Sequence, residues 1–332
     1  MVHSYIEGEL LFSSRNKIYR ITDLTNPQPE VVGVIPWKAY QRISTARIFD
    51  RYFKHSILQV HRTKRREYLV STGNTWWHID SKGNVFLVEK FSETRPMNRG
   101  ICESAKGITF VAEYISNPER SPVKIFRSED LRTFDIAWEF NGARTIRHVH
   151  ALVRDPELEN RIWVLTGDLD DESHFYYTDD DFNSLNCFLS DGQKSRAVDL
   201  IIRDGSLYWG MDSPSETPYV LSVKKESPDY IEKLFELPGP AYYQAQNEAG
   251  GIYLGISVEK RFTTRGLYGY VYGLRPDNSW REILHCRKNI FPEYGIFYFP
   301  KGILPDNFVV FSQKALLPYE GFLTIARDNA WN

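Results

Sequence analysis

Short apolar segments separated by polar turns recur along this chain roughly every 45–50 residues, which is the feature that most limits the folds open to it. The clearest unit runs from Arg147 to Phe188. It predicts four strands, at residues 148–154, 161–166, 174–178 and 186–188. These segments are rich in β-branched and aromatic residues, and acidic and proline turns lie between them. Because four short antiparallel strands form one blade of a β-propeller, this fold is the prediction.

The same four-strand plan fits most of the chain. The unit that follows has its first strand predicted at 197–202 and a hairpin signal at Asp204-Gly205. The remaining units cover residues 44–91, 100–140 and 241–285, with two nearly complete units at 8–34 and 295–326. We therefore predict an all-β chain, a single β-propeller domain of residues 1–332 with seven four-stranded blades. Six blades are the alternative, if the two end units share one closing blade.

The composition narrows the possible functions. A formal net charge of −2 argues against nucleic acid as the main partner. The sequence contains no run of about 18 apolar residues that would cross a membrane, and its start does not resemble a secretory signal. We therefore expect a soluble protein, cytoplasmic by default. The three cysteines, Cys102, Cys187 and Cys286, lack the spacing of a zinc site and are expected to be small apolar core residues.

Propeller geometry predicts where a functional site lies. Within a blade, the first strand begins and the second strand ends at the same face of the ring, so residues at these positions meet around the axis. The predicted first-strand starts contribute Arg99, Arg147, His148, His150, Arg196, Asp199, Tyr242, Tyr243 and Gln244. The predicted second-strand ends contribute Trp77, His78, Tyr114, Asp168, Asp212 and Glu259. Because core packing does not need charged residues at strand ends, we expect this face to bind a ligand.

These residue types suggest chemical roles. Guanidinium groups bind carboxylates, aromatic rings stack on sugars, and imidazoles and carboxylates act as general acids and bases. His148 and His150 are two positions apart on a predicted strand, so both imidazoles lie on one side, which is compatible with a metal ion. Trp77 fits either a sugar platform or packing between blades. Each polar residue also has a structural interpretation, as a hydrogen-bonded link between neighbouring blades.

Two predicted turns between third and fourth strands resemble degenerate Asp-boxes, the Ser-x-Asp-x-Gly-x-Thr-Trp motif of sialidase-like propellers. Residues 128–134 are the nearer match and residues 178–182 the weaker one. The resemblance implies sialidase chemistry, with an arginine triad and a tyrosine–glutamate pair, which match Arg99, Arg147 and Arg196, and Tyr242 or Tyr243 with Glu259. The segment Val34-Ile35-Pro36 lacks the preceding arginine of sialidases, so sialidase activity is an alternative here.

Carbohydrate-active propellers of this kind also include polysaccharide lyases and glycoside hydrolases. A lyase neutralises a uronate carboxylate, for which Arg147 or Arg196 is the candidate. It also needs a base and an acid, which the resemblance assigns to His148 or His150 and to Tyr243. Some propeller lyases hold a divalent metal with His and Gln, and the matching residues are His148, His150 and Gln244. A hydrolase would draw its two carboxylates from Asp168, Asp199, Asp212 and Glu259.

The leading hypothesis is an enzyme that cleaves an acidic, uronate-type oligosaccharide or polysaccharide, by lyase or hydrolase chemistry. Such an enzyme requires no cofactor, although His148, His150 and Gln244 are compatible with a divalent metal ion. The alternative is a non-catalytic propeller that binds a glycan or a protein. The repeated Trp-Asp endings of WD-type scaffolds do not occur here, which favours the enzyme.

Overall fold

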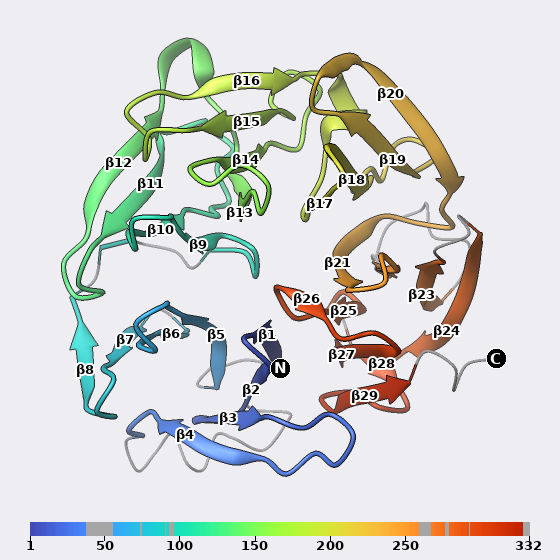
Figure 1. Ribbon diagram of the computed structural model, residues 1–332. Helices are drawn as coiled ribbons and strands as arrows, with labels where there is room; N and C mark the ends of the chain where they lie inside the picture. The colour runs from blue at the N-terminus through green and yellow to red at the C-terminus, as the bar shows by residue number, and fades with distance from the viewer. Residues whose placement is uncertain are drawn as a thin grey trace.

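The computed structural model describes residues 1–37, 56–73, 75–89, 91–92, 96–258, 267–275, 279–291 and 293–327. Its strands form seven sheets arranged as a ring, and the chain passes once around that ring (Figure 1). The seven-bladed β-propeller predicted from the repeat is therefore confirmed.

Each of the first five blades is an antiparallel sheet of four consecutive strands. Blade 1 contains β1 (Val2–Ile6), β2 (Glu9–Ser14), β3 (Lys17–Ile21) and β4 (Glu30–Val34). Blade 2 contains β5 (Ile57–Arg62), β6 (Tyr68–Thr72), β7 (Thr75–Ile79) and β8 (Val85–Val88). Blade 3 contains β9 (Ile101–Glu103), β10 (Thr109–Ala112), β11 (Val123–Ser128) and β12 (Asp135–Phe140). Blade 4 contains β13 (Val149–Arg154), β14 (Ile162–Thr166), β15 (Phe175–Thr178) and β16 (Asn186–Leu189). Blade 5 contains β17 (Ile201–Arg203), β18 (Ser206–Gly210), β19 (Tyr219–Lys224) and β20 (Ser227–Glu236).

Two short strands connect the last two blades. Blade 6 contains β21 (Ala241–Asn247), β22 (Ile252–Ile256), β23 (Tyr268–Leu274) and β24 (Trp280–Lys288). Blade 7 contains β25 (Ile296–Tyr298), β27 (Phe308–Lys314) and β29 (Leu323–Arg327). Two connecting strands, β26 (Ile303–Leu304) and β28 (Leu316–Leu317), leave blade 7 and pair with the inner and outer edges of blade 6. The seventh blade is therefore tied to the sixth by backbone hydrogen bonds as well as by side-chain packing.

Strand β14 shows how the sequence sets the blades face to face. All five of its residues are buried. Ile162 and Val164 pack in the core between blades 3 and 4, whereas Trp163 and Leu165 pack in the core between blades 4 and 5. Because strand side chains alternate in direction, a blade that is covered on both faces needs apolar residues at consecutive positions. The continuous apolar segments that marked the repeat have this origin.

The two ends of the described chain form separate blades, so the six-blade alternative is wrong. Blade 1 meets blade 7 through backbone contacts to Lys301. The amide of Tyr5 donates to the Lys301 carbonyl at 2.7 Å, and the amide of Lys301 donates to the His3 carbonyl at 2.9 Å. The Val2 amide also donates to Ser312 Oγ at 3.0 Å. These contacts close the ring.

Two predicted strands differ from the structure. The first strand of blade 5 begins at Ile201 and not at 197, since residues 197–200 run without a ladder after the 3-10 helix η2 (Gly192–Ser195). The segment 75–79 is the third strand of blade 2, because Gly73, with a φ of 56°, turns the chain back after β6. The second strand was predicted to end over residues 74–78, of which Asn74 lies outside the described residues. Trp77 and His78 are therefore third-strand residues and do not end a second strand.

Helical structure is minor in the part of the chain that the structure describes. It consists of η2 and a second 3-10 helix, η1 (Gly142–Arg144). None of these described helices has the length and apolar character needed to cross a membrane.

Candidate functional site

Polar side chains meet where β13 begins and β14 ends, as the blade geometry predicts. His148 directly precedes β13, His150 lies within it, and Asp168 follows β14 after Gly167. Gly167 has a φ of 76°, and a Cβ at this position would lie 2.1 Å from the Glu172 carbonyl oxygen. Only glycine fits this tight turn, which aims Asp168 back at the two histidines.

The two imidazoles are held in a defined tautomer. His148 Nδ1 lies 3.0 Å from the Ile115 carbonyl oxygen, and His150 Nδ1 lies 2.9 Å from the Ala197 carbonyl oxygen. A carbonyl oxygen only accepts, so both Nδ1 atoms carry the proton and donate it. Both Nε2 atoms of the neutral rings are consequently left with a lone pair. Backbone carbonyls orient metal-binding histidines in the same way.

Three lone-pair atoms converge as a result. The two Nε2 atoms lie 3.0 Å apart. Asp168 Oδ1 lies 3.4 Å from His148 Nε2 and 3.3 Å from His150 Nε2. The ligand atoms of these three residues all fall within 4.8 Å of one another, as one metal ion would require. Burial lowers the pKa of His150, which favours its neutral form.

Two arginines and a second carboxylate surround this group, which we call the His–Asp cluster (His148, His150 and Asp168). Arg147 Nη1 lies 3.0 Å from Asp168 Oδ2, and Arg196 Nη2 lies 3.2 Å from Asp168 Oδ1. Arg196 Nε also lies 3.3 Å from Asp212 Oδ2. Burial alone would raise the pKa of Asp168, but its contacts with the two histidines and the charge of Arg196 hold it well below its usual range.

The exposure of these residues gives the site a direction. The side chains of His148 and His150 are only 4% and 2% exposed, whereas that of Arg147 is 39% exposed. Arg147 therefore connects the buried cluster with solvent. Its Nε atom has no hydrogen-bond partner among the described residues. An anionic group arriving from solvent would meet this guanidinium first.

Tyr114 is the residue that sequence reasoning left without a role. It follows β10 of blade 3, at the position that Asp168 occupies in blade 4. Its ring centroid lies 4.1 Å from that of His148. Burial, together with the charges of Asp168 and Asp212, raises the pKa of Tyr114, so its hydroxyl keeps its proton. The matched blade position had already predicted Tyr114 at this face, but without a chemical role.

Several predicted site residues lie elsewhere around the axis. Arg99 donates to Asp199 Oδ2 at 2.8 Å and to the carbonyls of Gln244 and Phe299. The Gln244 side chain donates to the Tyr208 carbonyl at 3.1 Å, and it is not among the residues that meet at the histidines. The structure thus brings Asp168, and not Gln244, to the two imidazoles.

The predicted tyrosine candidates also lie outside the His–Asp cluster. Tyr243 is 3% exposed, and its ring stacks on that of Tyr298 at 5.3 Å. Burial raises the pKa of Tyr243 well above its usual value. Tyr242 contacts Tyr243 edge to face, at 6.3 Å between ring centroids. Glu259 lies outside the described residues.

His78 and Trp77 require a correction, because they belong to the third strand of blade 2. His78 Nε2 lies 3.2 Å from Glu67 Oε2, and Arg132 Nε donates to His78 Nδ1 at 3.1 Å. This contact links blade 2 to the turn after β11 in blade 3. Trp77 Nε1 donates to Thr72 Oγ1 at 3.2 Å. Both side chains serve packing and hydrogen bonding within and between blades.

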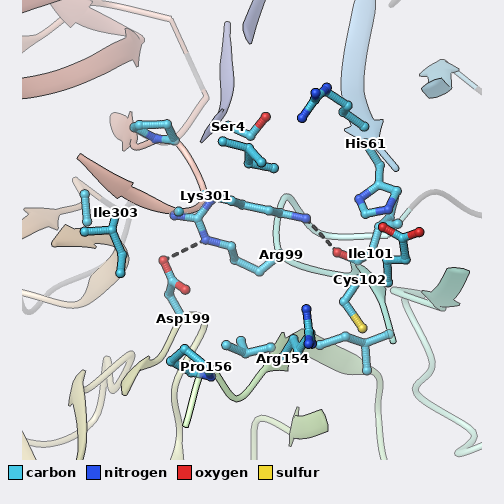
Figure 2. Close-up of a pocket in the computed structure, with 18 of the residues that line it drawn as sticks. Ser4, His61, Arg99, Ile101, Cys102, Arg154, Pro156, Asp199, Lys301 and Ile303 are labelled. Carbon is cyan, nitrogen blue, oxygen red and sulfur yellow. Dashed lines mark hydrogen bonds and ion pairs between the residues drawn. The ribbon is translucent and has the colours of Figure 1, made fainter. Parts of the chain in front are cut away.

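A separate cavity of about 450 Å³ lies along the axis (Figure 2). Its walls include the later residues of the first strands, such as Arg62 of β5, Glu103 of β9 and Arg154 of β13. The His–Asp cluster, in contrast, lies where β13 begins. Arg99 and Asp199 contribute to the wall of this cavity, and their ion pair is not part of the His–Asp cluster.

Solved structures of two lyases share this fold. The TM-score is 0.59 with a streptogramin B lyase, at 12% identity, with 95% of this chain and 90% of that chain covered. It is 0.58 with a catalytically inactive histidine-to-alanine virginiamycin B lyase from Staphylococcus aureus with quinupristin, at 12% identity, with 95% and 91% covered. At these identities the likeness shows the propeller fold, and it does not point to sialidases in particular. No protein-family model and no curated protein matches the chain.

Proposed function

We propose that this protein is a metal-assisted lyase that cleaves an acidic glycan beside a uronate, at the end of the propeller axis where the His–Asp cluster lies. The observation that carries the proposal is the convergence of three lone-pair atoms, His148 Nε2, His150 Nε2 and Asp168 Oδ1. Lone pairs at these distances repel one another unless a cation lies between them. Two imidazoles and one carboxylate are a donor set that binds divalent transition metals and leaves positions for substrate oxygens.

Neighbouring side chains fit the substrate of such a reaction. Arg147, with its half-exposed guanidinium, is placed to bind the uronate carboxylate beside the metal site. Withdrawing charge from that carboxylate makes the proton on the adjacent C5 carbon easier to remove. In the elimination the C5 proton passes to a solvent water molecule, the C4–O bond breaks with its electron pair going to the leaving oxygen, and the C–H electron pair forms the C4–C5 double bond. Tyr114, which keeps its proton, is placed to donate it to the leaving oxygen.

The geometry favours elimination over hydrolysis by a pair of carboxylates. A glycoside hydrolase needs one carboxyl group that stays protonated long enough to act as an acid. Asp168 does not meet this requirement, since its pKa is held well below the usual range. Burial raises the pKa of Asp199, but this carboxyl group is paired with Arg99 and lies outside the His–Asp cluster. The two structural neighbours are lyases by name, which is the same class of reaction.

The test begins with metal binding and ends with the product. Protein freed of metal with a chelator is titrated with Mn²⁺ or Zn²⁺, and it is then incubated with a panel of uronate-containing oligosaccharides. We expect one ion per chain, and products that mass spectrometry finds lighter by one water than the hydrolytic fragments. His150→Ala should weaken metal binding roughly 100-fold and abolish product formation. His285→Ala is the matched control, because the His285 side chain is 58% exposed, forms its ion pair with Glu282 and lies outside the His–Asp cluster.

Each of the other results contradicts the proposal. Fully hydrated products would indicate a hydrolase. Equal metal affinity in His150→Ala and the unmodified protein would place the ion elsewhere. Turnover of no substrate under any metal condition would favour a propeller that binds a glycan or a protein without catalysis.

A further inference from the structure

The cavity near the far ends of the first strands has features of a ligand site of its own. It is separate from the His–Asp cluster, and its walls come from at least five blades. Figure 2 shows Lys301 reaching across it towards Ile101, with Arg99, His61 and Arg154 arranged around the same space. A volume of about 450 Å³ is within the range of cavities that hold small molecules.

Two of the basic side chains in this cavity, Lys301 and Arg154, lack carboxylate partners among the described residues. Arg99 is neutralised by Asp199, at 2.8 Å. Lys301 Nζ, in contrast, donates only to the Ile101 carbonyl, at 2.7 Å, and no carboxylate among the described residues lies within ion-pair distance of it. Arg154 likewise has no ion pair to a described residue, and its buried Nε has no hydrogen-bond partner among them. Two basic side chains therefore face the cavity without an ion-pair partner among the described residues.

Burial and mutual repulsion disfavour positive charge on the basic groups of this cavity. Burial, and then the charge of Arg99, lower the pKa of Lys301 to about 7. Burial, and then the charge of Lys301, lower the pKa of His61 to about 3. An anion between these groups would remove this penalty, since it supplies the charge that the walls lack.

Further polar atoms of the walls are left unsatisfied. Ser4 is 4% exposed, and its Oγ has no hydrogen-bond partner among the described residues. The buried Nε2 of His61 also lacks one. Buried polar atoms are rarely left without a partner, and several around one cavity indicate groups that a bound molecule would satisfy.

We propose that this cavity binds a small organic anion, whose carboxylate or phosphate group lies between Lys301 and Arg154 and whose hydroxyl groups contact Ser4 and His61. The apolar part of the wall, which includes Ile101, Leu200 and Ile303, contacts the rest of the molecule. The site does not depend on the proposed lyase activity, because none of its residues belongs to the His–Asp cluster.

Isothermal titration and thermal unfolding test the proposal with two probes, inorganic phosphate and glucuronate, each compared with chloride at equal ionic strength. We expect saturable binding of at least one probe and a rise in the unfolding midpoint that chloride does not reproduce. Phosphate alone would identify a phosphate group as the ligand chemistry, glucuronate alone a carboxylate, and both a general anion site. Binding of neither probe would overturn the proposal.

Variants locate the binding. Lys301→Met removes the charge while keeping the length of the side chain, and it should weaken binding roughly tenfold or more without lowering the midpoint of the ligand-free protein. Arg154→Met provides an independent reading if Lys301→Met fails to fold. Lys82→Met is the control, because Lys82 is exposed in a turn of blade 2. Equal affinity in both cavity variants and the control would overturn the proposal, whereas His150→Ala should leave anion binding unchanged.

Discussion

At the scale of single residues, Asp155 joins two blades through one buried carboxylate. It lies in the turn after β13 and is fully buried. Lys225, from the turn between β19 and β20 of blade 5, lies 2.8 Å and 3.0 Å from its two oxygens. Trp163 Nε1 donates to Asp155 at 2.9 Å, and the amides of Glu157 and Leu158 donate to it as well. One residue thus holds its own turn, a core tryptophan and the neighbouring blade.

Replacing this carboxylate should destabilise the protein. Asp155→Asn removes the buried one of the two carboxylates that pair with Lys225 and leaves Glu157, at 2.7 Å, as its counter-charge, so we expect a loss of about 2 kcal/mol in urea unfolding at neutral pH. Asp179→Asn is the control, since Asp179 pairs with Arg161 at the surface, where such a pair contributes less than about 1 kcal/mol. Equal losses in the two variants would contradict the role given to Asp155.

The same residue sets a pH dependence. Burial alone would raise the pKa of Asp155, but hydrogen bonds from Lys225 and Trp163 outweigh burial and lower it. A carboxyl group with a lowered folded pKa stabilises the fold above its unfolded pKa of about 4, and this contribution is lost as the pH falls through the folded pKa. The difference between Asp155→Asn and the unmodified protein should therefore be full at neutral pH and should shrink below about pH 4.

The candidate site was predictable where strand direction and alternation decide the outcome. His148 lies at the start of a first strand and Asp168 at the end of a second strand, and the structure brings them together with Arg196, which precedes blade 5. Gln244 was beyond this reasoning. A register shift in β21 between Ala241 and Gln244 changes which face the following side chains take, so Gln244 is directed to Tyr208. A single sequence carries no clear signal for such a bulge.

At the scale of elements, the turn between β11 and β12 is fixed by one aspartate. Asp130 Oδ1 accepts hydrogen bonds from the amides of Arg132 and Thr133, both at 2.8 Å, and from Ser128 Oγ at 3.1 Å. Leu131, with a φ of 60°, is held in a left-handed conformation with its side chain 3% exposed in the core between blades 2 and 3. The turn therefore inserts an apolar residue between two blades.

Removing that aspartate should loosen the turn while leaving the blade intact. We expect Asp130→Ala to cost about 1 kcal/mol and to speed hydrogen exchange at the amides of Arg132 and Thr133. Asp135→Ala is the control, since Asp135 is an exposed residue of the neighbouring strand β12. Unchanged exchange at the two amides in Asp130→Ala would show that other contacts hold this turn.

Most strands could be predicted because each is a continuous apolar segment between polar turns. The prediction failed at β7, where the two-residue connection after β6 is too short to stand out from the strands on either side. The sequence Thr75-Trp76-Trp77 continues the apolar pattern, so the second strand seemed to run on to His78. The decisive residue is Gly73, whose positive φ turns the chain there.

At the scale of the whole molecule, the ring closes between two separate blades, blade 1 and blade 7, and not within one blade that both ends share. Gly302 lies at this junction with a φ of 100°, and a Cβ there would lie 2.0 Å from the Tyr5 carbonyl oxygen. The adjacent Lys301 provides the backbone hydrogen bonds between blades 1 and 7. Closure therefore depends on a close backbone approach that admits only glycine.

Two glycine substitutions distinguish the free-energy cost of this steric collision from the cost of placing alanine at a positive φ. Gly8→Ala places a Cβ in open space at a φ of 77°, so it should cost about 1 kcal/mol. Gly302→Ala adds the collision with Tyr5, and we expect it to cost about 2 kcal/mol more in guanidinium unfolding. If the two variants were equally stable, the junction would be looser than the structure indicates.

Because the junction joins the first blade to the last, the ring cannot close until blade 7 has been synthesised. Val2, Leu10 and Ile21 of blade 1 are buried against residues such as Phe311 of blade 7, about three hundred residues later in the chain. At roughly 5–20 residues per second, the ribosome leaves the first blade without this cover for roughly 15–60 seconds. During that interval a nascent chain exposes an apolar sheet face. We therefore expect the first blade to be the segment that either binds chaperones or associates with other copies of the chain.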